Sequence, residues 1–162
     1  MVDRMLLCGF KAFFIFASAL IIVGFMVCSF HAKADELSKC EQYRERVEII
    51  LESEAVSIDY YYLMVAESRC TDKAVSNKGA KGFWQLMPGT LKHYGCNEPF
   101  NLECSTRAAA RYIKRLQAEF KRFDDVIMAY NMGGHNYRRY GASKQAKGLL
   151  FAVKRMMQND NQ

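Results

Sequence analysis

Residues 1–34 have the order of charges and apolar residues that marks a segment removed before folding. A basic start and an apolar run over residues 12–30 are followed by an Ala-x-Ala site that ends at Ala34. A secretory signal peptide has this order, and we expect cleavage after Ala34. The alternative is an uncleaved membrane anchor, since the apolar run approaches the roughly 20 residues of a bilayer span. In either case the fold is confined to residues 35–162 and is exported.

The exported part of the chain keeps an even number of cysteines. They are Cys40, Cys70, Cys96 and Cys104. Thiols in even number in an exported chain predict two disulfides, for which three connectivities exist. Cys96 and Cys104 bracket a short polar loop, so we favour that pair and assign the other two cysteines to each other.

The size and net charge of the exported part limit the classes of protein to which the chain can belong. Roughly 128 residues make one domain that can bury its own core. Loss of the leader removes three basic residues and one acidic residue, which reduces the net charge from +6 to +4. This charge suits an anionic cell-wall polymer. Nucleic acid is disfavoured by the export signal, and neither a metal nor a cofactor is expected, since His93 and His135 lack a ligand-like spacing from a cysteine pair.

Two helices are predicted in the first part of the domain. The first has apolar residues at three- and four-residue steps after the possible caps Asp35 and Ser38. These apolar positions are Cys40, Tyr43, Val47, Ile50, Leu51 and Ala55. The second begins at about Asp59, which is also a capping residue type, and runs to Glu67. Its density of apolar residues indicates a buried core helix.

The remaining chain predicts further helices and one turn region. Residues 73–82 have turn composition, so any short β-hairpin lies there. Pro88 suits the first turn of a short helix that ends near Gly95, and Ser105 can cap a longer helix that reaches Phe120. Either Asp124 or Asp125 starts a helix over residues 126–131, which Gly133 and Gly134 end, and a last amphipathic helix covers residues 143–157. The sum is a mostly helical single domain.

Three sequence blocks carry the strongest functional signal. Glu67-Ser68 is followed by Ala-Val-Ser at residues 74–76, Gly-Ala-Lys-Gly-Phe-Trp-Gln-Leu-Met-Pro at residues 79–88, and Ala-Tyr-Asn-Met-Gly at residues 129–133. Their order and spacing resemble the SLT-type lytic transglycosylases, lysozyme-like enzymes that cleave the glycan strand of peptidoglycan. The resemblance covers residues 57–136 and implies an α+β lysozyme-like fold with at most a small β-hairpin near the active-site cleft.

Glu67 is the candidate catalytic acid. Cleavage of a glycosidic bond needs a carboxyl group that is still protonated near neutral pH. The end of a helix and the apolar residues 63–66 before it both disfavour the carboxylate, so we expect a raised pKa, toward about 6. The alternative is an ordinary solvated glutamate. Asp72, Asp124 and Asp125 are not obvious partners for Glu67 in the carboxylate pair that hydrolytic glycosidases use.

The resemblance implies that Glu67 acts twice. It first protonates the oxygen that leaves muramic C1, and then takes the proton of the C6 hydroxyl, which closes a 1,6-anhydro ring without water. The resemblance also implies substrate-binding roles, alongside structural alternatives for several of these residues. The residues concerned are Ser76, Gln85, Met87, Tyr130 and Asn131.

Some residues depart from the family pattern, and some alternatives stay open. Phe83-Trp84 replaces a smaller pair, and Trp84 belongs either to the core or to a sugar-stacking surface. His135 is expected in a loop. A hydrolytic muramidase, or a weakly active glycan-docking component of a secretion or pilus machine, are the competing functions. We expect a periplasmic monomer that acts on peptidoglycan strands and meets the membrane only through an uncleaved leader.

Overall fold

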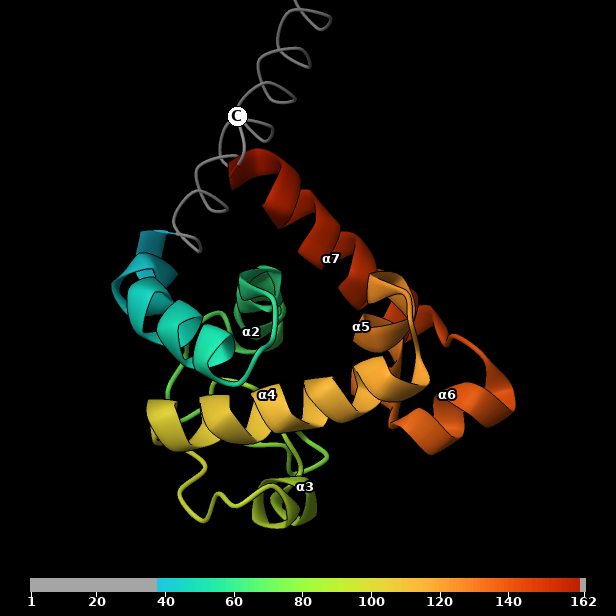
Figure 1. Ribbon diagram of the computed structural model, residues 1–162, viewed down its shortest axis with the longest axis horizontal. Helices are drawn as coiled ribbons and strands as arrows, with labels where there is room; N and C mark the ends of the chain where they lie inside the picture. Colours follow the sequence, from blue (N-terminus) through green and yellow to red (C-terminus); the bar gives the residue numbers. More distant parts are fainter. Residues whose placement is uncertain (1–37, 161–162) are drawn as a thin grey trace, which may run out of the picture. The chain divides into compact units, whose positions relative to one another are not determined.

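The helix α2 (Tyr61–Ser68) is the central element of the computed structural model, which describes residues 38–160. It follows the 3-10 helix η1 (Ile58–Tyr60), and residues 61–65 are all buried. Figure 1 shows α2 between the helix over residues 38–53 and α7 (Lys144–Asp160). The prediction of a buried core helix that ends with Glu67 in its last turn is therefore confirmed.

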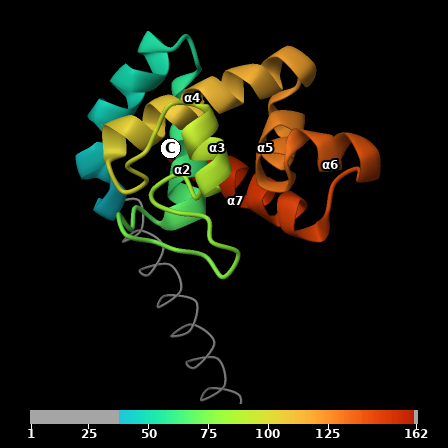
Figure 2. The same ribbon diagram turned by 90° about the horizontal axis from the view of Figure 1, so that it is seen from below.

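The other helices pack around this centre. They are α3 (Pro88–His93), α4 (Leu102–Glu119), α5 (Phe123–Met132) and α6 (Gly134–Tyr140). The helix α3 packs on α4, while α5 contacts α4, α6 and α7. In Figure 2, α5 separates α6 from α2. From Lys39 onward these elements form one compact unit, and the predicted leader with its cleavage site lies outside the described residues. Within residues 38–160 no helix combines the length and the apolar character of a membrane span.

A polar network joins the helix over residues 38–53 to the end of α7. The Arg44 guanidinium lies 2.7 Å from the Asp160 carboxylate and donates to Glu48 at 2.8 Å. Tyr62 of α2 donates its hydroxyl hydrogen to Asp160 at 2.5 Å. This network holds together three segments that are distant in sequence. The predicted apolar face of the helix over residues 38–53 is buried at Cys40, Val47, Ile50 and Leu51.

The mostly helical fold class is confirmed, and the region predicted for a hairpin forms a compact turn. Among the described residues, β-structure consists of isolated bridges from Lys81 to Val75 and to Leu86. The Gly82 N–H donates to the Ala74 carbonyl at 2.8 Å, which closes the turn upon itself. Several backbone groups of residues 74–86 thus bond to one another rather than in a ladder of strands.

Two predicted helix caps are wrong. Ser57, and not Asp59, caps the helical segment that leads into α2, since its hydroxyl accepts from the Asp59 N–H. Asn101, and not Ser105, caps α4, with its side-chain oxygen 2.9 Å from the Cys104 nitrogen. Ser105 instead lies buried inside the first turn and donates to the Asn101 carbonyl. In both places several residues of capping type lie close together in the sequence, so the residue types alone do not identify which one caps the helix.

The predicted loop after α5 is also wrong. Gly133 ends α5 with a φ of 79°, as expected of a glycine there, but the chain starts α6 at the next residue, which places His135 in a helix. Asp124 and Asp125 lie in the first turn of α5 rather than at its cap. Pro88 occupies the first turn of α3 as predicted. The Gly133-Gly134 pair therefore marks a sharp change of direction between two helices.

Trp84 is a core residue. Its side chain is fully buried, and its indole N–H donates to the Thr106 hydroxyl of α4 at 2.9 Å. A buried indole nitrogen normally needs such a partner. The open alternative of a sugar-stacking tryptophan is thus decided in favour of the core.

The structure contains two disulfides. Cys40 is bonded to Cys70, which ties the helix over residues 38–53 to the turn after α2. Cys96 is bonded to Cys104, which closes the loop between α3 and α4. Both bonds join the pairs favoured by the sequence.

We predict that Thr106→Val destabilises the protein by about 1–3 kcal/mol, because the buried Trp84 N–H loses its acceptor while the shape of residue 106 is kept. Thr106→Ser is the matched control, since it retains the hydroxyl. Urea denaturation measures both variants. A Thr106→Val protein as stable as the wild type would show that the hydrogen bond contributes nothing.

Candidate active site

Glu67 lies in the last turn of α2, where the chain turns away sharply. Arg69 and Cys70 both have positive φ angles, of 49° and 54°. The Arg69 N–H bonds the Val65 carbonyl, and the Ser68 hydroxyl accepts from the Cys70 N–H. This geometry ends the helix at Ser68, one residue after Glu67, and the Cys40–Cys70 disulfide fixes the outgoing turn. The carboxyl group is therefore held at the negative end of a short, buried helix.

Burial raises the pKa of Glu67 from its ordinary value of 4.5 to about 7. Desolvation is the larger cause, since removal of water disfavours the charged form. A hydrogen bond with the Asn131 side chain acts in the opposite direction and favours the carboxylate. The side chain nevertheless keeps some access to solvent. The group can thus be protonated at neutral pH and still exchange a proton with a ligand.

Tyr130 and Asn131, in the last turn of α5, both interact with Glu67. Asn131 makes the side-chain hydrogen bond to Glu67, and the negative charge of Glu67 raises the pKa of Tyr130 further above its value set by burial. The Tyr130 hydroxyl donates to the Trp84 carbonyl at 2.8 Å. Its hydrogen is therefore held by the backbone, so Tyr130 can offer a ligand its oxygen lone pair only.

Ser76 and Gln85 both stabilise the turn over residues 74–86. The Ser76 hydroxyl oxygen accepts from the Ala80 N–H at 2.9 Å. The Gln85 side-chain nitrogen donates to the carbonyls of Ala74 and Gly82, at 3.2 and 2.8 Å. Both amide hydrogens of Gln85 are used in this way, so its side-chain oxygen is the atom left to meet a sugar. Gln85 has a φ of 46°, a strained backbone that these bonds hold in place.

Gly82 lies within the same turn, and Met87 directly follows it. Met87 is 47% exposed at the start of α3, so it presents an apolar surface beside the turn. Gly82 has a φ of 73°, and a Cβ built on it would lie 2.0 Å from the Pro99 carbonyl oxygen. The turn is therefore packed against the loop that the Cys96–Cys104 disulfide closes.

The other acidic residues considered in the sequence have partners elsewhere. Asp72 is exposed and accepts from the Lys73 N–H. Asp124 pairs with Lys154 at 2.7 Å, and Asp125 accepts from the Tyr137 hydroxyl at 2.6 Å. None of these carboxylates is among the causes of the Glu67 pKa shift. The site thus centres on a single carboxyl group.

A cavity of about 450 Å³ adjoins this site and shares Asn131 with it. Its other walls include Lys78 of the turn, Met132 of α5 and Tyr140 of α6. The sequence does not predict this cavity, because it does not predict the helix α6, which forms part of the lining. An exposed tyrosine seven residues after a Gly-Gly pair carries no signal of its own.

The comparisons with known proteins identify the family and the fold of the chain. The family model for the Transglycosylase SLT domain matches residues 53–149. A solved structure of an inactive variant of the lytic transglycosylase Slt from Pseudomonas aeruginosa aligns with 68% of this chain, at a TM-score of 0.61 and 18% sequence identity. The alignment covers 22% of that protein, so this chain matches about a fifth of its length. The structural match confirms the lysozyme-like fold.

We predict that Glu67→Gln stabilises the protein increasingly as the pH rises. The unfolded wild type releases the proton of residue 67 near pH 4.5, whereas the folded protein holds it to about pH 7, so the wild type loses stability across this interval. The difference between variant and wild type grows from near zero at pH 4 to on the order of 3 kcal/mol above pH 8. Denaturation at several pH values measures it.

The exposed Asp72→Asn is the matched control for this measurement, because it replaces a carboxyl group by an amide at an exposed position. A difference between Glu67→Gln and the wild type that does not grow with pH would contradict the raised pKa.

Proposed function

This chain belongs to the Transglycosylase SLT domain family, and from that premise we propose that it is a peptidoglycan lytic transglycosylase with Glu67 as its catalytic acid and base. The proposed reaction cleaves the β-1,4 bond between N-acetylmuramic acid and N-acetylglucosamine. The observation that carries the proposal is the carboxyl group of Glu67, whose pKa of about 7 results from burial at the end of α2. A group of this pKa is half protonated at neutral pH and serves as acid and as base in turn.

In the first step the protonated Glu67 donates its hydrogen to the glycosidic oxygen. The bond between that oxygen and muramic C1 breaks, and the N-acetylglucosamine side leaves with a new hydroxyl group. Positive charge develops at C1, which the N-acetyl group of the same sugar stabilises. Desolvation supports this step because it keeps Glu67 protonated until a substrate arrives.

In the second step the Glu67 carboxylate removes the hydrogen of the C6 hydroxyl. The C6 oxygen bonds to C1 and closes a 1,6-anhydro ring, and Glu67 regains the proton that it gave away. No water enters the product. The hydrogen bond from Asn131 supports this step, since it stabilises the carboxylate that exists between the two transfers.

Four other residues take positioning and binding roles in this proposal. The lone pairs of Tyr130 and the side-chain oxygen of Gln85 accept hydrogen bonds from the sugar. The remaining hydrogen of the Ser76 hydroxyl can be donated to it, and Met87 offers an exposed apolar contact. These roles are consistent with the hydrogen bonds that already hold each group.

We further propose that the protein works in the periplasm. The two disulfides suit an oxidising compartment, and the leader predicted at residues 1–34 would deliver the chain there. Recruitment by a secretion or pilus machine would suit a domain of this small size.

We predict that Glu67→Gln lowers the rate of peptidoglycan cleavage by at least ~10²-fold, because the amide can neither donate nor accept the proton that the reaction transfers. Chromatography of muropeptides released from purified cell wall measures the rate. Asp72→Asn is the control for removal of a nearby carboxylate, and its rate matches the wild type. Comparable rates for the Gln variant and the wild type would remove Glu67 from the mechanism.

The mass of the products tests the reaction type. We expect muramic ends that are lighter by one water than hydrolysed ends, because the C6 hydroxyl replaces water as the nucleophile. Mass spectrometry of the released fragments distinguishes the two. Ends of full hydrolytic mass would identify a muramidase instead.

A further inference from the structure

We propose that the cavity between Lys78, Asn131 and Tyr140 is a specificity site, in which a sugar ring of the glycan strand stacks on Tyr140 while the carboxylate of its muramic substituent pairs with Lys78. This inference rests on the proposed function, which supplies the class of substrate. It adds two residues that no sequence block singled out.

The cavity is placed to receive the strand next to the reacting bond. It is an open surface depression of about 450 Å³ rather than an enclosed pocket, which suits an extended strand that lies along the surface. It shares Asn131 with Glu67, and its walls come from the turn over residues 74–86, the end of α5, α6 and the start of α7. A strand bound across Glu67 therefore meets this cavity with a neighbouring sugar.

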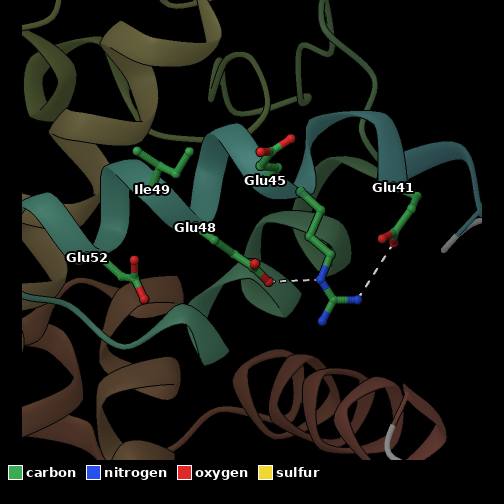
Figure 3. A pocket seen from close by; sticks show the side chains of 6 residues that line it. Glu41, Glu45, Glu48, Ile49 and Glu52 are labelled. Carbon is green, nitrogen blue, oxygen red and sulfur yellow. Dashed lines mark hydrogen bonds and ion pairs between the residues drawn. The ribbon is translucent and has the colours of Figure 1, made fainter.

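Charge distinguishes this cavity from the other large depression of the described chain. Among the described residues that line the cavity beside Glu67, Lys78 is the charged one. The other depression, of about 480 Å³, lies along the helix over residues 38–53. Four carboxylates and Arg44 line it, and Arg44 pairs with Glu41 and Glu48. Figure 3 shows the four glutamates, Glu41, Glu45, Glu48 and Glu52, along this helix. An anionic strand is repelled by that surface and attracted by Lys78.

Tyr140 provides the stacking surface. Its side chain is 70% exposed at the end of α6, and the Arg139 guanidinium lies 5.3 Å from the ring centre. An exposed aromatic ring combines an apolar face with a polar edge, and sugars present the same combination. The Arg139 guanidinium lies over one face of this ring, so a sugar would stack on the other face.

Amide groups complete the lining. The Asn136 side-chain nitrogen donates to the Met132 carbonyl at 3.0 Å, so its side-chain oxygen is fixed in orientation. Gln145, at the start of α7, lines the same cavity. Such groups match the hydroxyl and N-acetyl groups of a sugar.

The carboxylate could belong to either of two forms of the substrate. In strands that carry stem peptides it is a carboxylate of the peptide, and in peptide-free strands it is the lactyl carboxylate of muramic acid. Both present the same chemistry to Lys78. An oligomer of N-acetylglucosamine has the same backbone with no carboxylate, and serves as the neutral reference.

The first test measures binding of these three ligands to the Glu67→Gln protein by calorimetry at low salt. We expect added Lys78→Gln to weaken binding of a carboxylate-bearing strand about threefold, as for an exposed ion pair. Lys78→Glu weakens it about tenfold, because attraction becomes repulsion, and neither change affects the neutral oligomer. Lys39→Gln, an exposed lysine outside the cavity, is the matched control and leaves binding unchanged.

The second test concerns Tyr140. Tyr140→Ala weakens binding of all three ligands about fivefold, since stacking does not depend on the carboxylate. Phe151→Ala removes a ring of nearly equal exposure, 69%, on α7 and leaves binding unchanged. In the active protein the Lys78 and Tyr140 variants raise KM and keep kcat, whereas a role in the chemical step would lower kcat.

The outcomes separate this inference from the proposed function. If the Lys78 variants lose affinity for one of the two carboxylate ligands, that ligand identifies the source of the carboxylate. If they lose affinity for both, the shared chemistry is supported. If this binding pattern appears while the protein with Glu67 intact does not cleave peptidoglycan, the proposed function fails and the specificity site stands. If the protein with Glu67 intact cleaves peptidoglycan, unchanged affinity for every ligand on Lys78→Glu and on Tyr140→Ala would overturn the inference.

Discussion

The desolvation of one carboxyl group at the C-terminal end of α2 is the constraint on which the rest of the site depends. The helix is short, and its residues 61–65 are buried between neighbouring helices. Glu67 is thereby carried into surroundings of low polarity, with Asn131 as its hydrogen-bonding partner. The positive φ angles of Arg69 and Cys70 turn the chain away at once, so the helix does not continue past the carboxyl group.

The buried Trp84 connects the parts of the site. Its indole N–H bonds to Thr106 of α4, and its carbonyl accepts from Tyr130 of α5. The turn that contains Gln85 is therefore attached to two helices through one residue. This arrangement explains why a tryptophan in a substrate-binding sequence block serves the core, and why Tyr130 is held next to Glu67.

The sequence predicted the elements whose signal is local. Pro88 at the start of α3, the apolar face of the helix over residues 38–53 and the burial of α2 follow from spacing or from backbone chemistry. Ser57 and Asn101 were missed as caps because capping residues cluster nearby, and only the packed backbone selects among them. The α6 helix was missed because a Gly-Gly pair commonly ends helical structure, and its contacts with α5 lie outside local propensity.

The residues of the candidate site also divide into those with a local sequence signal and those without one. The sequence blocks indicated Glu67 and its raised pKa, because apolar neighbours and a helix end are visible along the chain. They could not show that the hydrogens of Gln85 and Tyr130 are held by the backbone, or that Lys78 and Tyr140 line one cavity with Asn131. These features depend on segments brought together by the fold, such as the turn over residues 74–86 against α5.

The most direct test of the account is the ionisation of Glu67 itself. Carbon-13 NMR of the side-chain carboxyl carbon of residue 67, assigned by comparison with Glu67→Gln and followed from pH 3 to pH 9, measures its pKa in the folded protein. We expect a titration midpoint near 7 for the Glu67 carboxyl group, because burial disfavours its charged form. A midpoint near the ordinary value of 4.5 would show that the carboxyl group is hydrated and would contradict the central claim.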